Sequence, residues 1–252
     1  MERLRVIEFA TGTPWYNMAL DEAIARKVGS GESGPTLRLY GWSPEAVSVG
    51  YFQEVREEVN LEFCWRMRIE VVRRLTGGGS VVHSRDEMTY SLTIGEGDPM
   101  MPTDVQESYR IICTPIVSSL RRLGADAWFR PVNDIEVGGR KISGSAQTRR
   151  FGAVLQHGTI LLDLDNTLLS ALKVSTEKLK GKGVSTPRDR VTTLRQSLGR
   201  PIGHQEIGRI IAEEFGRTFR CEAVQSDPSH EEESEAHALE GKYRSQDWLF
   251  RR

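Results

Sequence analysis

The chain of 252 residues is long enough for one large domain, or for one domain with a small annex. Its charges nearly cancel, with 34 Lys and Arg against 35 Asp and Glu, so the composition gives no electrostatic reason to expect a nucleic-acid partner. Apolar residues make up 38% of the chain, and no apolar run is long enough to cross a membrane. These numbers predict a soluble globular protein.

The cysteines and the N-terminus predict a cytoplasmic location. Cys64, Cys113 and Cys221 are odd in number and widely spaced, which favours reduced thiols over a disulfide framework or a cysteine metal site. No apolar segment follows residues 1–5, so a signal peptide is not expected.

Apolar periodicity predicts a chain of mixed strands and helices. Thr13 and Pro14 are typical of a helix start, as N-cap and first helical residue. The predicted strands are 5–9, 36–40, 46–50, 69–72, 80–83, 88–94, 128–129, 134–137, 140–144 and 154–163. The predicted helices are 14–28, 54–63, 104–123, 168–172 and 204–218. Residues 226–240 are acidic and are predicted to be mobile, whereas the aromatic side chains of 243–250 favour docking onto the rest of the chain.

Three consecutive glycines, residues 77–79, stand between two β-branched runs. Consecutive bare N–H groups can form a concave nest for an anion, and Arg73 and Arg74 would supply positive charge at its mouth. A long hairpin turn explains the same glycines. A P-loop and a dinucleotide fingerprint are both excluded, because a strand rather than a helix follows Ser80.

A second cluster, residues 139–146, surrounds Lys141 with small residues. In a strand, Lys141 and Ser143 share one side, so the lysine could reach into a pocket and hold an anion. A solvated lysine on an edge strand fits the same pattern. Neither His83 nor His157 has a second ligand at metal-binding spacing, so no zinc site is predicted.

Six motifs in order, between about residues 14 and 192, resemble lipoate–protein ligases of the biotin/lipoyl ligase superfamily. They are Pro14-Trp-Tyr-Asn-Met-Ala-Leu-Asp-Glu22, the loop from Arg73 to His83, Asn133-Asp134-Ile135, Gly139 to Ala146, His157 to Leu162, and Ser185-x-x-Arg188-x-Arg190-Val-Thr. The resemblance implies an α/β fold of the α+β type. It would be a mixed β-sheet with packed helices, like the catalytic domains of class II aminoacyl-tRNA synthetases and biotin–lipoyl ligases. We expect residues 1–225 to form this catalytic domain, and 226–252 to be an acidic linker with a short coda and no full accessory domain.

The resemblance implies an ATP-dependent ligase. Such an enzyme activates lipoate or octanoate as acyl-AMP with ATP and Mg²⁺, then passes the acyl group to a lysine amine of a lipoyl carrier domain. The carrier would be a 2-oxoacid dehydrogenase E2, a glycine cleavage H protein or a similar protein. A separate accessory-domain protein is a further expected partner, and neither nucleic acid nor a membrane is expected.

The implied site residues come from the matched motifs. Lys141 is the expected catalytic cation, stabilising charge on the carbonyl oxygen and the phosphate. The nucleotide would contact Arg74, Gly77, Gly78, Gly79, Ser80, Val81, Val82 and Lys141. Lipoate would contact Arg74, Gly79, His83, Lys141, Ser143, Gly144, His157 and Gly158, with Tyr40, Val72, Val81 and Val82 along an apolar slot. No protein cluster is predicted to hold a metal, although Asp134 could contact the Mg²⁺ that accompanies ATP.

Two other functions remain open. Related octanoyltransferases move octanoyl from acyl carrier protein without ATP and use a cysteine nucleophile. Residues 125–130 and 142–155, where that cysteine would be expected, contain none, which favours the ligase. Cys113 falls within a predicted helix and is expected to be a buried structural thiol. The third possibility is a non-catalytic module that binds lipoate or a lipoyl domain.

Overall fold

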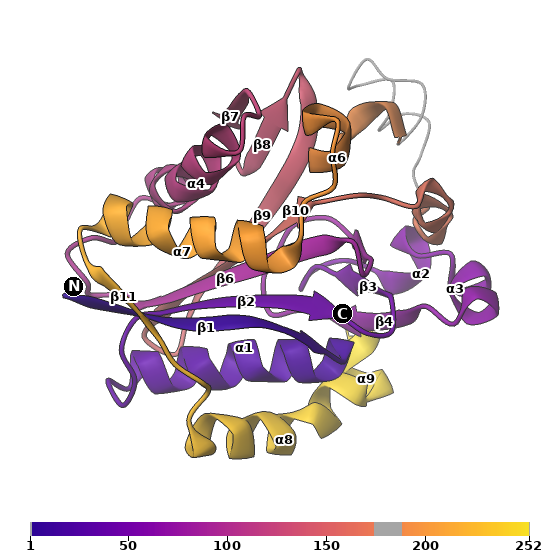
Figure 1. Ribbon diagram of the computed structural model, residues 1–252. Coiled ribbons are helices and arrows are strands. Elements are labelled where there is room, and N and C mark those ends of the chain that lie inside the picture. The colour runs from indigo at the N-terminus through magenta and orange to yellow at the C-terminus, as the bar shows by residue number, and fades with distance from the viewer. Residues whose placement is uncertain (1, 174–187, 252) are drawn as a thin grey trace.

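An eight-stranded mixed sheet forms the centre of the protein (Figure 1). The computed structural model describes residues 2–173 and 188–251, so Ser185 of the last motif lies outside the described residues. The strand order is β11-β1-β2-β6-β10-β9-β8-β7; β1 is parallel to both its neighbours, and the other pairs are antiparallel. The bounds are β1 (Arg3–Gly12), β2 (Thr36–Trp42), β6 (Glu87–Gly95), β7 (Ala127–Arg130), β8 (Asp134–Val137), β9 (Arg140–Arg150), β10 (Ala153–Leu161) and β11 (Glu222–Gln225). This confirms the predicted fold class.

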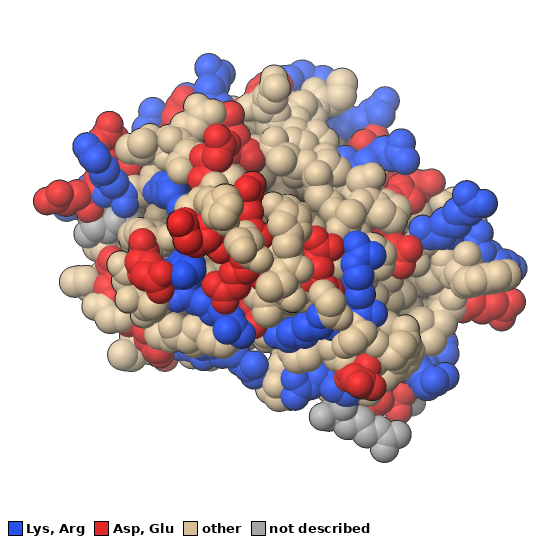
Figure 2. Space-filling view, turned by 90° about the horizontal axis from the view of Figure 1, so that it is seen from below, with Lys and Arg blue, Asp and Glu red and all other residues tan. Residues whose placement is uncertain are grey.

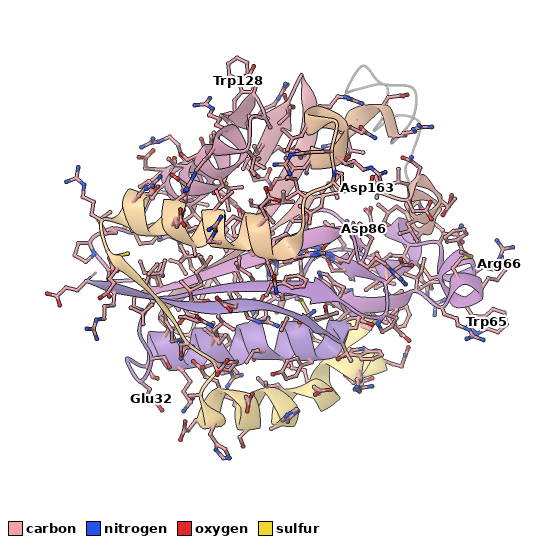
Figure 3. All side chains as sticks on the ribbon, in the orientation of Figure 1. Glu32, Trp65, Arg66, Asp86, Trp128 and Asp163 are labelled. Atoms are coloured by element: carbon pink, nitrogen blue, oxygen red, sulfur yellow. The ribbon has the colours of Figure 1, made fainter. Side chains whose placement is uncertain are left out.

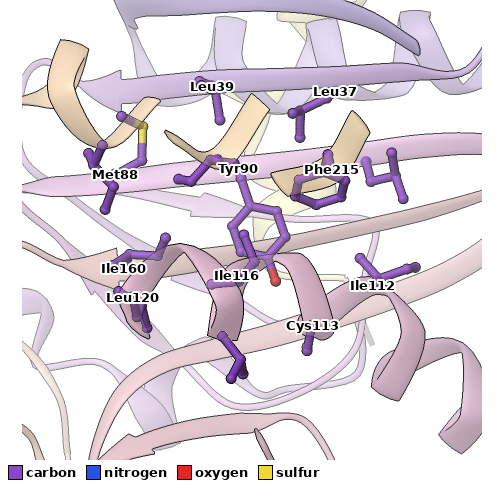
Figure 4. Packing of buried hydrophobic residues seen from close by; sticks show 14 of the residues in the cluster. Leu37, Leu39, Met88, Tyr90, Ile112, Cys113, Ile116, Leu120, Ile160 and Phe215 are labelled. Atoms are coloured by element: carbon purple, nitrogen blue, oxygen red, sulfur yellow. The ribbon is translucent and has the colours of Figure 1, made fainter. Parts of the chain in front are cut away.

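Helices cover both faces of the sheet (Figure 1). On one face α4 (Val105–Arg122) and α7 (His204–Phe219) bury their apolar stripes, and Figure 4 shows Cys113 and Ile116 of α4 and Phe215 of α7 grouped around Tyr90. On the other face lie α1 (Pro14–Gly29) and α8 (His230–Arg244). As predicted, Thr13 caps α1 by accepting a hydrogen bond from the amide of Tyr16.

A second, three-stranded sheet explains how the glycine loop is held. Its order is β4 (Glu70–Arg73), β3 (Ala46–Val49), β5 (Val81–His83), so β4 and β5 pair with opposite edges of β3. The glycines therefore cross from one edge of β3 to the other, and the hairpin interpretation is wrong. Around this sheet lie α2 (Val55–Glu58), α3 (Leu61–Met67), η1 (Asn166–Ala171) and α9 (Gln246–Leu249). Two short elements, η2 (Arg188–Arg190) and α6 (Leu194–Leu198), complete the described helices.

Several elements differ from the sequence prediction. The helix expected over 54–63 is two helices, because Val59 is extended and Asn60 caps a new helix. Strand β9 continues to Arg150 rather than ending at residue 144. Strand β11 was not predicted, since all four of its residues are exposed and give no apolar alternation.

The acidic segment predicted to be mobile is instead an ordered helix, α8. Ser229 begins it with a capping box closed by Glu232. Its other end is fixed by Glu22 of α1, whose buried Oε2 accepts from Lys242 Nζ at 2.5 Å and Tyr243 Oη at 2.6 Å. Figure 2 looks onto this side and shows acidic and basic side chains interspersed. The docking of 243–250 is confirmed, whereas the boundary between 1–225 and 226–252 stays a prediction.

Candidate functional site

A cavity of about 540 Å³ opens between the two sheets. Nearly every predicted site residue lines it: Arg74, Gly78, Gly79, Ser80, Val81, Val82, His83, Asp134, Lys141, Ser143, Gly144, His157 and Gly158. Tyr40 of the predicted slot lines it as well, whereas Gly77 and Val72 are absent from the lining. Its exposed wall is mainly apolar.

Arg74 organises the glycine loop from inside the protein. Its five N–H groups are all used: Nε donates to Thr76 Oγ1, Nη1 to both the carbonyl and the hydroxyl of Ser48, and Nη2 to the carbonyls of Gly77 and Gly79 at 2.7 Å each. Burial lowers the pKa of Arg74 to about 10. Arg74 therefore does not lie at the mouth of the loop, but binds the carbonyls of Gly77 and Gly79 from within the protein. Its contact with a nucleotide stays a prediction.

The loop also needs a glycine beneath it. A Cβ on Gly50 would stand 2.1 Å from the carbonyl oxygen of Gly78, and Gly78 itself has a φ of +86°. Only glycine fits at position 50, and glycine adopts the positive φ at position 78 without strain. Gly50, just beyond β3, was not predicted, because a single glycine after a strand carries no such signal.

Lys141 extends along the cavity wall from β9. A Cβ on Gly144 would meet Nζ at 2.3 Å, so the bare glycine makes room for the lysine. Nζ pairs with Asp134 Oδ1 at 2.6 Å, and Arg190 lies 3.6 Å from the other carboxylate oxygen. Asp134 is thus neutralised by two cations. Among residues 2–173 and 188–251, no group of three or more His, Cys, Asp or Glu could hold a metal ion.

A serine, a histidine and a glutamate form a hydrogen-bonded chain in the cavity wall. Ser48 Oγ lies 2.7 Å from His83 Nε2, and His83 Nδ1 lies 2.7 Å from Glu87 Oε1. Because a carboxylate only accepts, Nδ1 is the donor to Glu87. In the neutral ring Nε2 is then the acceptor, and the Ser48 hydroxyl donates to it. Ser48 and His83 line the cavity, and Glu87 is fully buried behind them. Ser48 was missed because Ala46–Val49 reads as an ordinary strand.

A second chain of the same kind lies on the other side of Arg74. Thr76 Oγ1 is 2.7 Å from His157 Nε2, and His157 Nδ1 is 3.3 Å from Asp21 Oδ2. Burial lowers the pKa of His157, so the ring is neutral at pH 7. Thr76 is fully buried and absent from the cavity lining, so its hydroxyl cannot meet a bound molecule.

The three thiols all lie away from the cavity lining. Cys113 is buried in α4, as predicted (Figure 4). Its Sγ lies 3.6 Å from Ser145 Oγ and 3.5 Å from Gln156 Nε2. Burial raises the pKa of the Cys113 thiol, and burial raises the pKa of Cys64 to about 11. Burial also raises the pKa of Cys221. The described structure therefore places no activated thiolate beside the cavity.

Comparison with known proteins gives the family. The model of the lipoyl protein ligase A/B catalytic domain matches residues 13–216. Octanoyltransferase LipM of Kyrpidia tusciae is 36% identical, with 100% of both chains covered, and that of Bacillus subtilis is 34% identical, with 100% of this chain and 99% of its own covered. A structure of lipoate–protein ligase A bound with ATP has a TM-score of 0.84 at 30% identity and 99% coverage of both chains. A bipartite lipoate protein ligase from Thermoplasma acidophilum has a TM-score of 0.84 at 29% identity, with 99% of this chain and 96% of its own covered.

These relatives correct the prediction of an ATP-dependent ligase. Eight curated relatives that are 32–38% identical over 94–100% of this chain are named octanoyltransferases. The absence of a cysteine from two short segments was a weaker guide than similarity along the full chain. ATP is named for the solved lipoate–protein ligase A, and it is not named for these relatives.

No helix among the described residues is both long and apolar enough to span a bilayer.

Proposed function

The chain belongs to the lipoyl protein ligase A/B catalytic domain family, and from that premise we propose that it transfers an octanoyl group from a carrier-bound thioester to a lysine amine of a lipoyl domain. The observation that carries the proposal is similarity to octanoyltransferases along the entire chain. The expected donor is octanoyl–acyl carrier protein. The expected acceptor is the lipoyl domain of a 2-oxoacid dehydrogenase E2 or a glycine cleavage H protein.

The cavity supports this transfer chemically. Its mainly apolar wall, with Val81, Val82 and Leu161, suits the octanoyl chain. Lys141 supplies a partly exposed cation, held in place by Asp134. A fixed cation beside the thioester carbonyl would stabilise the negative charge that develops on its oxygen during attack. A thioester is already activated, so the reaction needs neither ATP nor Mg²⁺.

The test is transfer to a purified apo lipoyl domain, read by intact mass. The donor is octanoyl–acyl carrier protein, and parallel tubes contain free octanoate or free lipoate with ATP and Mg²⁺. We expect the mass of one octanoyl group to appear on the lipoyl domain in the first tube, without nucleotide.

Two controls make the result specific. A lipoyl domain whose acceptor lysine is replaced by arginine must remain unmodified, and Lys141→Ala must slow the transfer. Modification only in the tubes with free acid and ATP would contradict the proposal. Binding of the lipoyl domain without modification in any tube would favour the non-catalytic module instead.

A further inference from the structure

We propose that Ser48 is the nucleophile of this acyl transfer, activated by His83 and oriented through Glu87, so that the octanoyl group passes through an oxygen ester on the protein. This inference rests on the proposed function. It answers the question that the three cysteines leave open, since none of them lines the cavity.

The hydrogen bonds around Ser48 are those that a nucleophilic hydroxyl needs. Its Oγ–H donates to His83 Nε2 at 2.7 Å, and Oγ accepts from Arg74 Nη1 at 3.1 Å. The histidine can take the proton as the oxygen attacks, and the buried guanidinium stabilises negative charge on that oxygen. One lone pair of Oγ remains for attack, on a residue that lines the cavity.

The histidine is fixed in the orientation that this role requires. Its ring stacks on Trp42, with centroids 3.8 Å apart and planes 17° apart. Glu87 Oε1 accepts from His83 Nδ1 and from Thr89 Oγ1, and Thr89 in turn accepts from Trp42 Nε1. This closed ring of contacts presents Nε2 to Ser48, as the third member of a catalytic triad does for its base.

Glu87 has one further property that packing alone does not explain. Its Oε2 is buried and has no hydrogen-bond partner among the described residues. A buried acceptor without a partner costs free energy, and its retention calls for a reason. The reason would be that the Glu87 carboxylate stabilises the His83 imidazolium that forms during each transfer.

The chain Thr76–His157–Asp21 provides an internal comparison. It has the same order of groups, but Thr76 is fully buried, is absent from the cavity lining and accepts from Arg74 Nε. Ser48, which is 2% exposed, belongs to the cavity lining, whereas Thr76 does not. The two chains flank Arg74 and differ in this access.

The reaction balances in two steps. First, Ser48 Oγ bonds to the thioester carbonyl carbon, the C–S bond breaks, and His83 carries the serine proton to the leaving thiolate. Second, the lysine amine of the lipoyl domain attacks the ester carbonyl, the C–O bond breaks, and the amine loses a proton through His83 while Ser48 regains its hydroxyl. No oxidant, reductant or nucleotide is consumed.

The experiment looks for the intermediate in the unmodified enzyme. The protein is mixed with octanoyl–acyl carrier protein without acceptor, quenched in acid, and analysed by intact mass and peptide mapping. We expect one octanoyl group on the peptide that contains Ser48, stable to neutral hydroxylamine as an oxygen ester. Adding lipoyl domain before the quench should discharge it.

Variants then separate nucleophile from scaffold. Ser48→Ala should form no adduct and lose roughly 10³-fold or more in kcat. Ser48→Cys should form an adduct that neutral hydroxylamine removes. Glu87→Gln should slow adduct formation and lower kcat with little change in KM. Loss of the fold would not lower kcat selectively in this way. Ser119→Ala replaces a buried serine of α4 that is not part of the cavity lining; it is the matched control and should behave as wild type.

The outcomes distinguish this inference from the proposed function. The assignment of Ser48 would be overturned if the octanoyl group were found on a cysteine. It would also be overturned if the adduct disappeared when Cys64, Cys113 and Cys221 are all replaced by alanine. Full transfer by Ser48→Ala would also overturn it, and would indicate that the lysine amine of the lipoyl domain attacks the thioester directly. If the wild type transfers nothing from any thioester, the proposed function fails with it.

Discussion

Trp248 and Arg73 exchange hydrogen bonds across 175 positions of the chain. The Trp248 indole Nε1 donates to the Arg73 carbonyl at 2.9 Å, and Arg73 Nε donates to the Trp248 carbonyl at 3.1 Å. The same guanidinium donates to the carbonyls of Leu249, Gly50 and Tyr51. The C-terminal helix α9 is thereby joined to the strand that leads into the glycine loop.

Loss of the Arg73 side chain should release this end of the chain. Arg73→Leu leaves four buried or half-buried carbonyl oxygens without their donor, so we expect the free energy of unfolding to fall by about 3 kcal/mol. Trp248→Phe keeps an aromatic ring and removes one donor, so it should cost about 1 kcal/mol. Urea unfolding followed by circular dichroism measures both values.

The matched control is another tryptophan on the surface. Trp65 projects from α3 with 83% of its surface exposed (Figure 3). Trp65→Phe should leave the free energy of unfolding within about 0.5 kcal/mol of wild type. Equal stability of Arg73→Leu and wild type would mean that α9 is not anchored through this residue.

Glu22 should make stability depend on acid pH. Burial raises the pKa of this carboxyl, but hydrogen bonds from Lys242, Tyr243 and Arg26 outweigh burial and leave its pKa below the ordinary value. A folded pKa below the unfolded one gives stability that is present above the unfolded pKa and is lost as pH falls through the folded pKa. Stability should therefore decline below about pH 4.5, near the unfolded pKa of a glutamate.

The Glu22→Gln variant tests that assignment. It should be less stable than wild type at pH 7, and the difference should shrink as the pH is lowered in a series of urea titrations. Glu8→Gln, at an exposed position of β1, is the control and should follow the wild-type curve. A constant difference between Glu22→Gln and wild type from pH 7 to pH 3 would rule out titration of Glu22 as the source.

A methyl group at Gly50 should disable the glycine loop. The added Cβ would stand 2.1 Å from the Gly78 carbonyl oxygen. This oxygen belongs to the backbone, so no side-chain rotation can relieve the clash. We expect Gly50→Ala to displace residues 77–79, to lower stability by about 1–3 kcal/mol and to abolish most octanoyl transfer. Gly34→Ala has open space around its Cβ and should retain both stability and activity. Normal transfer by Gly50→Ala would show that the loop position is not needed.

Replacement of Lys141 should affect the rate more than the fold. The lysine side chain is partly exposed and pairs with one carboxylate, so Lys141→Met should change stability by less than about 1 kcal/mol. If it stabilises charge in the transition state, kcat for octanoyl transfer should fall about 10²–10³-fold. Steady-state kinetics with octanoyl–acyl carrier protein provide the measurement. Arg130→Met, which removes an exposed ion pair with Glu136 outside the cavity lining, should leave kcat unchanged.

Local sequence signals fixed the elements whose causes lie close together in the chain. Thr13 and Pro14 predicted the start of α1, and Gly138 and Gly139 predicted the hairpin of β8 and β9. The small residues around Lys141 and the glycines at 77–79 located two walls of the cavity. In each case the deciding interaction spans only a few residues.

Interactions between distant segments decided the rest. Ser48 meets His83 because β3 and β5 pair, a contact over 35 positions that leaves no mark in the Ala46–Val49 pattern. Residues 230–244 form a helix because Lys242 and Tyr243 reach Glu22, which outweighs an acidic composition. Arg74 points inward because five acceptors surround it, some of them supplied by a strand far back in the chain. Composition and spacing thus determined which groups were available, and only tertiary packing decided which of them share one cavity, because burial and charge pairing depend on neighbours that are remote in sequence.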